Sequence, residues 1–172
     1  KINAMYNARP REFTPLPHQE NGFNPANNEP DGFFKEEGAG ITVVARNGGP
    51  DSVKWDRDDY PRVDGFGVTG ASHGGGVFIN GYVENLMVSN NHIFANQGTL
   101  GGGIRSGDSL GVVAGDPVDA KNDDLNIHHN QIAQNGANGG SGAGISLYTG
   151  TEEYEVTENW VCGNFSSGNG GG

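Results

Sequence analysis

Hydrophobic residues recur along this chain in a fixed pattern, with asparagines at constant offsets between them. Between Gly81 and Ile104 the pattern reads Leu-x-Val-x-x-Asn-x-Ile-x-x-Asn and is followed by three glycines. Two further copies keep the hydrophobic and asparagine positions. The three copies begin at Leu86, Leu125 and Tyr154. Repetition of this kind indicates one structural unit that is used several times.

A weaker copy of the pattern lies upstream of these three. It keeps hydrophobic residues at Val63 and Val68 and a glycine run at 74–76. It has Phe66 and Ala71 where the other copies have asparagine. We therefore count it as an additional repeat, which precedes the other three in the chain and lacks the asparagines.

The spacing inside each copy predicts short strands. Hydrophobic residues at i and i+2 have strand alternation, and no stretch sustains the spacing of a helix. A repeat every 20 to 50 residues or so is typical of a stacked solenoid. Leu86 and Leu125 are 39 residues apart, whereas Leu125 and Tyr154 are 29 apart, so residues 106–122 are expected to form an inserted loop. The sequence thus predicts an all-β chain of about four coils with one inserted loop.

Stacked coils explain why asparagine recurs. Equivalent residues of neighbouring coils lie about one strand spacing apart, so an inward asparagine bonds the asparagine above and below it and also supports the backbone of a bend. The glycine runs allow positive φ and close approach of one coil to the next. The two predicted ladders are Asn91, Asn130 and Asn159, and Asn96, Asn135 and Asn164.

This pattern resembles the right-handed parallel β-helix, the pectate-lyase-like superfold. Three segments carry the narrower likeness: "NEPDGFFKEEGAGITVV", "DGFGVTGASHGGGVFINGYVENLMVSNNHIFANQGTLGGGIRSG" and "YEVTENWVCGNFSSGNGGG". They are similar to β-helix segments of very large, uncharacterised bacterial proteins that are exported. The resemblance covers about Asn24 to Gly172, and it implies the fold and an extracellular or cell-surface location but no established activity.

The resemblance also predicts a neighbour for the last coil. In those proteins the final glycines are followed by further coils, so the chain is expected to be a fragment of a longer β-helix. Solenoids need several repeats and covered ends, and an open end exposes strand edges that invite pairing. The expected partner at the C-terminal end is therefore a further set of β-helix coils, from the same protein or from a second chain.

The domain organisation follows from the position of the repeats. Residues 1–37 are rich in proline and are expected to form an extended segment that packs on the solenoid. Residues 38–172 hold the coils, with a polar excursion at 50–61 and the insertion at 106–122.

Charge narrows the range of partners. The chain carries 21 acidic and 10 basic residues, a formal charge of -11 and a pI near 4.6. Nucleic acid and anionic membranes require a basic surface, so we expect neither as a partner. No apolar run is long enough to cross a membrane, and we expect no membrane insertion. Cations and neutral sugars remain compatible, with polysaccharide as a candidate partner.

Calcium is the candidate ion, and no other cofactor is expected. It takes several oxygen ligands, often from loop carboxylates, although the acidic positions here match neither an EF-hand nor a nonapeptide calcium repeat. Solvated loop charge is the interpretation that we favour, and a calcium site is the alternative. The candidate ligands lie in or beside the insertion: Asp108, Asp116, Asp119, Asp123 and Asp124.

The superfold also implies a candidate catalytic set. Its lyases and epimerases abstract a sugar proton with a basic side chain or a tyrosine, while a cation or an arginine neutralises the uronate. The residues of this chain nearest to that set are Arg105, Lys121, His128 and Tyr148. The acidic charge opposes polyanionic uronates unless calcium bridges them.

Three functions remain open at this point. The first is a structural or interaction segment of a large exported β-helix that acts as a scaffold, an adhesive surface or an assembly element. The second is a carbohydrate-active enzyme, a polysaccharide lyase or an epimerase. The third is a non-catalytic glycan-binding module that uses exposed aromatic side chains, among them Trp55, Tyr60, Tyr82, Tyr148 and Trp160. We favour the first, in which the segment is not an enzyme.

Overall fold

The computed structural model describes residues 38–45, 60–107, 112–113, 116–117, 121–139 and 142–171. The proline-rich segment 1–37 and all but the last two residues of the excursion 50–61 lie outside these ranges. Within them the chain is built from strands and turns and contains no helix. It follows that no helix in this part of the chain has the length and apolar character needed to cross a membrane.

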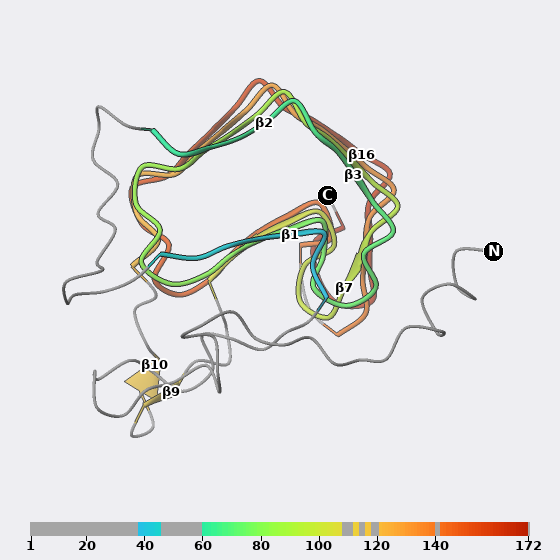
Figure 1. Cartoon of the computed structure of the whole chain (residues 1–172). Helices are drawn as coiled ribbons and strands as arrows, with labels where there is room; N and C mark the ends of the chain where they lie inside the picture. The colour runs from blue at the N-terminus through green and yellow to red at the C-terminus, as the bar shows by residue number, and fades with distance from the viewer. Residues whose placement is uncertain are drawn as a thin grey trace.

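Short parallel strands stack into four sheets (Figure 1). The first sheet contains β1 (Ile41–Val43), β4 (Val77–Ile79), β8 (Ile104–Ser106) and β14 (Ile145–Leu147). The second contains β2 (Arg62–Asp64), β5 (Met87–Ser89), β11 (Asn126–His128) and β15 (Glu155–Thr157). The third contains β3 (Gly67–Thr69), β6 (His92–Phe94), β12 (Gln131–Ala133) and β16 (Trp160–Cys162). The fourth contains β7 (Gln97–Gly98), β13 (Gly136–Ala137) and β17 (Phe165–Ser166).

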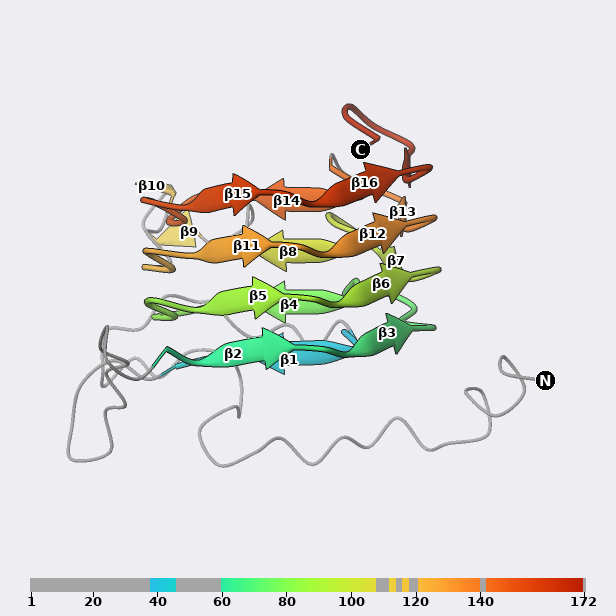
Figure 2. The same ribbon diagram turned by 90° about the horizontal axis from the view of Figure 1, so that it is seen from above.

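Each of four passages of the chain adds one strand to the first, second and third sheets, and the last three passages also add one to the fourth, so that the strands lie in successive layers (Figure 2). We call these layers coils: the first contains β2 and β3, the second β5 to β7, the third β11 to β13 and the fourth β15 to β17. The repeats are in register, because Ile127 pairs with Val88 on one side and with Val156 on the other. The predicted all-β architecture of stacked parallel strands is therefore confirmed.

The inward residues of each strand form columns that fill the interior. In the second sheet Val63, Val88 and Ile127 lie one above the other and are 6%, 0% and 0% exposed. Columns from the other sheets contribute Val77, Ile79 and Ile93 to the same cluster. Burial of one such aliphatic side chain contributes about 1.5–3 kcal/mol, which offsets the ordering of the short strands.

The glycine runs allow the close approach that their positions predicted. A Cβ atom added at Gly103 would lie 2.3 Å from the carbonyl oxygen of Gly144 and 2.8 Å from the side chain of Ile132. Positive φ, the second predicted use of these runs, occurs at Gly75 and Gly142, with values of 79° and 73°. A side chain at Gly103 has no room unless the neighbouring coil moves.

The insertion departs from the stacked pattern. Strand β8 ends at Ser106 and β11 begins at Asn126. Between them β9 (Val112–Val113) and β10 (Asp116–Pro117) pair antiparallel with each other, apart from the four parallel sheets. The described strands of the insertion thus add none to the four parallel sheets.

Candidate functional site

The first predicted ladder exists and connects the second, third and fourth coils. The Oδ1 atom of Asn130 accepts hydrogen bonds from the backbone N of Asn91 at 3.0 Å and from its Nδ2 at 2.9 Å. The Oδ1 atom of Asn159 accepts the same pair from Asn130, both at 2.9 Å. Asn91 and Asn130 are each 2% exposed, so these bonds lie in the interior and are costly to lose.

The second ladder repeats this geometry one bend further along each coil. Asn96 donates from its backbone N and from Nδ2 to Oδ1 of Asn135, both at 3.1 Å. Asn135 donates in the same way to Asn164, both at 3.0 Å. Every amide of both ladders also donates to a backbone carbonyl of the preceding coil, as Asn130 does to Val88 at 2.8 Å.

The ladders lie at backbone bends, as the sequence predicted, and the structure adds the conformation of the residue before each asparagine. The residue before each first-ladder asparagine has positive φ: 54° at Asn90, 54° at His129 and 53° at Glu158. In the second ladder Ala95 and Gln134 take φ of 53° and 56°. Residues with side chains rarely adopt this conformation, and it persists where surrounding contacts impose it. The buried carboxamides supply those contacts.

Both ladders have a direction. We call each asparagine of a ladder a rung. The carboxamide oxygen of a rung always accepts from the preceding coil, so the donors of each rung are paired with the oxygen of the rung in the next coil. In the first coil, Phe66 and Ala71 have no carboxamide, and their backbone N atoms donate to Asn91 and Asn96. Among the described residues the ladders therefore begin on the second coil, and Asn159 and Asn164 are their last members.

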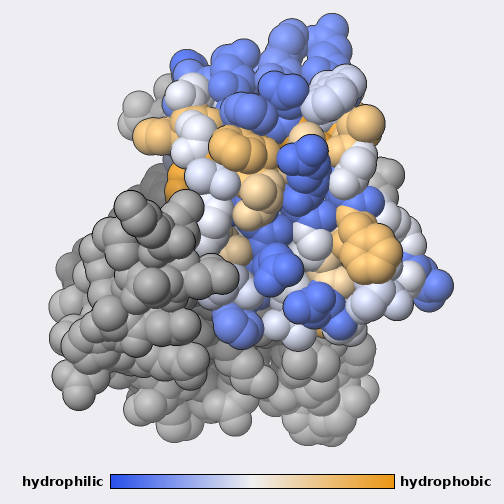
Figure 3. All heavy atoms as spheres, turned by 90° about the vertical axis from the view of Figure 1, so that its right-hand side faces the viewer, coloured by the Kyte–Doolittle hydropathy of each residue, from blue (hydrophilic) through white to orange (hydrophobic). Residues whose placement is uncertain are grey.

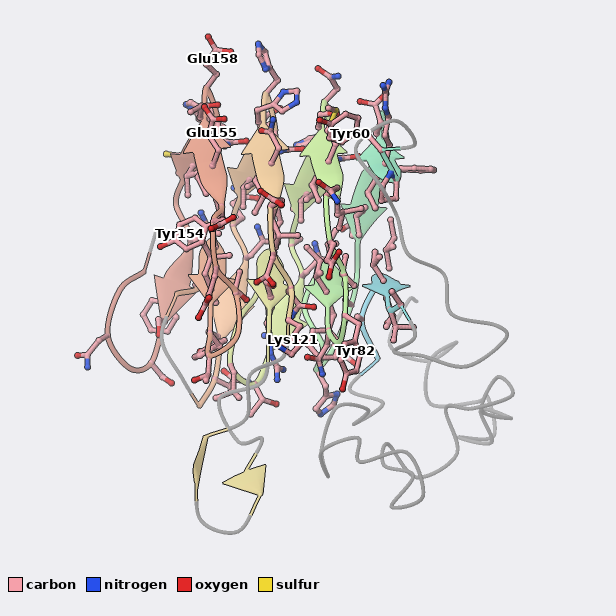
Figure 4. The ribbon with its side chains drawn as sticks, turned by 90° about the vertical axis from the view of Figure 1, so that its left-hand side faces the viewer. Tyr60, Tyr82, Lys121, Tyr154, Glu155 and Glu158 are labelled. Atoms are coloured by element: carbon pink, nitrogen blue, oxygen red, sulfur yellow. The ribbon has the colours of Figure 1, made fainter. Side chains whose placement is uncertain are left out.

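The fourth coil exposes residues whose equivalents are buried elsewhere. Val156 is 39% exposed and Tyr154 is 51% exposed, whereas Val88 and Leu125 in the coils below are at most 1% exposed. Asn159, Val161 and Asn164 are half-buried. Figure 4 shows this end of the stack at the left, where Tyr154 is labelled. We call the surface formed by Tyr154, Val156, Asn159, Val161 and Asn164 the terminal face.

The predicted catalytic residues are only partly brought together. The guanidinium carbon of Arg105 lies 4.5 Å from the ring centroid of Phe78 and 6.0 Å from that of Tyr148. Arg105 is 1% exposed, and the hydroxyl of Tyr148 donates to the carbonyl of Leu100. Lys121 is exposed at the corner that precedes the third coil.

His128, the fourth member of that set, lies on a different sheet. It ends β11 in the second sheet, whereas Arg105 and Tyr148 belong to and follow strands of the first. Nδ1 of His128 is 2.8 Å from Nδ1 of His129, and Nε2 of His129 is 2.9 Å from Glu158. Glu158 lies at the far edge of the second sheet from Lys121 (Figure 4). The set thus divides into the pair Arg105 and Tyr148 and two separate residues.

The candidate calcium ligands fall in three classes. Asp123 and Asp124 are half-buried in the corner before the third coil, and Asp124 has a φ of 55°. Asp116 is described as part of the backbone of β10, and Asp108 and Asp119 lie outside the described residues. In the part of the chain that the structure describes, no group of three or more His, Cys, Asp or Glu side chains is arranged to hold a metal ion.

Two polar anchors were missed by the sequence analysis. Asn122 is fully buried, and its Oδ1 accepts from the backbone N of Gly81 and of Val83, which fixes a third corner. On the first coil, Asp64 accepts from Ser89 at 2.6 Å and from Asn90 at 2.8 Å. These two bonds hold the pKa of the Asp64 carboxyl below its usual value. Neither residue belongs to the repeated template, so periodicity gave no signal for them.

Exposed aromatic side chains lie on the outside of the stack. Trp160 is 53% exposed and follows Gln131 and His92 in the outer column of the third sheet. The rings of His92 and Phe94 stack with centroids 4.4 Å apart. Figure 3 shows the side of the molecule on which β3, β16 and β7 lie, where hydrophobic residues are interspersed with hydrophilic ones. Trp55 lies outside the described residues.

Comparison with known proteins yields no relative: no protein-family model, no curated protein and no solved structure matches this chain.

Proposed function

We propose that the stacked sheets form a right-handed parallel β-helix. The winding sense in Figure 2 supports the right hand, because β2, β5, β11 and β15 run one way in front and β1, β4, β8 and β14 run the other way behind as the coils advance. Connections between parallel strands of one sheet are right-handed in nearly all proteins, which supports the same hand. The two asparagine ladders and the inward aliphatic columns fit this fold.

The role we propose is that of a structural or interaction segment of a large exported β-helix at the cell surface or outside the cell. The observation that carries this proposal is the terminal face, where the interior columns of the stack meet solvent. Parallel strand edges with exposed apolar side chains favour pairing with another strand. Further β-helix coils, from the same protein or from a second chain, are the partner that continues these columns.

Addition of one coil tests this role. The added segment consists of residues 145–153 followed by residues 125–144 of this chain, fused after Gly172, and so forms one 29-residue repeat. If the terminal face accepts coils, the fusion unfolds in one cooperative transition at a higher denaturant midpoint than the original chain. A scrambled segment of the same composition is the control. No shift of the midpoint, or a shift equal to that of the scrambled control, contradicts the proposed role.

Glycan binding is the second candidate, because Trp160 is exposed beside Gln131 in the outer column of the third sheet. Aromatic faces with neighbouring hydrogen-bonding groups suit neutral sugar rings. A panel of neutral and uronate polysaccharides, with and without calcium, tests it by calorimetry. Binding that Trp160→Ala abolishes and Gln134→Ala keeps supports this function. Ultraviolet absorbance of an unsaturated product would instead identify a lyase.

A further inference from the structure

The two ends of the ladders differ in the hydrogen-bonding groups that they present. On the terminal face Asn159 and Asn164 use their Oδ1 atoms and one Nδ2 bond each toward the third coil. In the rungs below, the backbone N and Nδ2 also donate to the carboxamide oxygen of the next coil. Among the described residues, neither the backbone N of Asn159 nor that of Asn164 has such an acceptor. The terminal face therefore presents donor pairs at two positions.

We propose that the terminal face selects a β-strand coil that carries a side-chain acceptor, most simply asparagine, at both ladder positions. This inference rests on the proposed role and specifies the partner chemistry. The acceptor oxygens must point back toward Asn159 and Asn164, and aliphatic residues must lie over Val156 and Val161. Both requirements are already met between the second and third coils and between the third and fourth.

The chain's own first coil does not meet these requirements. It has Phe66 and Ala71 at the ladder positions, so stacking it on the terminal face of a second copy would bury the donor pairs without an acceptor. Val63 and Val68 are also 6% exposed, which shows that the inner column of the first coil is already covered. Head-to-tail polymerisation, the hazard of an open solenoid, is opposed at both surfaces.

A second terminal face is an equally poor partner. Two such faces placed against each other bring donors opposite donors, and neither supplies an oxygen. Exposed carboxylates at Glu155 and Glu158 border the face and add like-charge repulsion. The terminal face is thus mismatched to the first coil and to a second terminal face, and it matches a coil whose carboxamide oxygens point toward it.

The fusion described above tests the selectivity when its ladder positions are varied. Three versions of the added coil are compared. The first keeps asparagine at both ladder positions, the second carries Asn130→Leu with Asn135→Leu, and the third carries Asn130→Asp with Asn135→Asp. Each substitution is made only in the added copy. Leucine keeps the size and removes the acceptor, whereas aspartate keeps an acceptor oxygen. Amide hydrogen exchange is measured at the backbone N of Asn159 and Asn164. We expect exchange to slow at least about tenfold with asparagine and aspartate but not with leucine.

The outcomes separate this inference from the proposed role. Equal protection by the leucine version overturns the selectivity and leaves the acceptance of coils intact. Protection by none of the three versions, without a rise in the unfolding midpoint, contradicts both. Sedimentation of the unmodified chain gives an independent result: a monomer is expected. Concentration-dependent oligomers that Val156→Glu dissolves would make a second copy the occupant and overturn the proposal.

Discussion

The first and fourth coils have the same strand pattern but opposite surroundings. Val63 in the first coil is 6% exposed, and Val156 at the equivalent position in the fourth is 39% exposed. The first coil has no asparagine in its bends, whereas the fourth has two that are half-buried. Equivalent positions in a repeat thus differ in burial and in hydrogen bonding because their neighbours differ. The partner that we propose would add at the end that carries the ladder residues.

The largest difference is expected between an inner and a terminal rung. Asn130→Ala removes the acceptor for Asn91 and the donors to Val88 and Asn159, and it should lower the free energy of unfolding by about 3–5 kcal/mol. Asn159→Ala leaves groups that water can reach and should cost about 1–2 kcal/mol. Denaturant unfolding measures both, with exposed Gln131→Ala as the control. Equal losses at the two rungs would contradict the burial difference.

Close approach between coils is the next largest effect. Gly103→Ala forces a Cβ against the backbone of the third coil and should cost about 3 kcal/mol. Gly67→Ala is the matched control, because nothing lies within 4 Å of the added Cβ. It should change stability by about 0.5 kcal/mol or less, or stabilise the chain by restricting its unfolded state. Similar thermal midpoints for the two variants would argue against tight stacking.

The inner column of the second sheet contains three valines, and their burial differs between the two ends of the stack. Val88→Ala should cost about 2–3 kcal/mol, since the side chain is fully buried. Val63→Ala should resemble it, whereas Val156→Ala should cost about 1 kcal/mol or less. Equilibrium unfolding of the three variants ranks them directly. A loss at Val156 as large as at Val88 would mean that the terminal face is covered in solution.

The missing first rung can be supplied. Phe66→Asn places a carboxamide where its Nδ2 can donate to Asn91, beside the existing backbone bond from residue 66. The gain in free energy of unfolding should be about 1 kcal/mol or less, because position 66 is exposed. Phe66→Leu, which lacks the donor, is the comparison. A gain with leucine equal to that with asparagine would assign the effect to side-chain size.

The smallest effect concerns pH at the first coil. The bonds from Ser89 and Asn90 lower the pKa of Asp64 from 3.8, so ionised Asp64 favours the folded state above that pH. This contribution should disappear as the pH falls through the lowered folded-state pKa. The stability difference between the chain and Asp64→Asn should accordingly shrink below about pH 3.8, measured by urea unfolding. A difference that stays constant with pH would exclude a role for the charge.

Much of the architecture was predictable from spacing. Residues that recur at a fixed period must become neighbours when coils stack, and this predicted the columns of Val88 and Ile127 and the ladder from Asn91 to Asn159. The absence of asparagine at Phe66 and Ala71 was equally visible. The chemistry proposed for Arg105 and His128 was less predictable, because proximity between different sheets depends on how the chain turns at its corners.

The sequence by itself determined which residues are equivalent, because a repeat period assigns every position to a column. Only the tertiary structure decided the direction of the ladders, the positive φ at His129 and Glu158, and the burial of Arg105. The repeat period would be the same if the carboxamides pointed in the opposite direction or if a different end of the stack were covered. Those choices depend on contacts between coils, which exist only after the chain has folded.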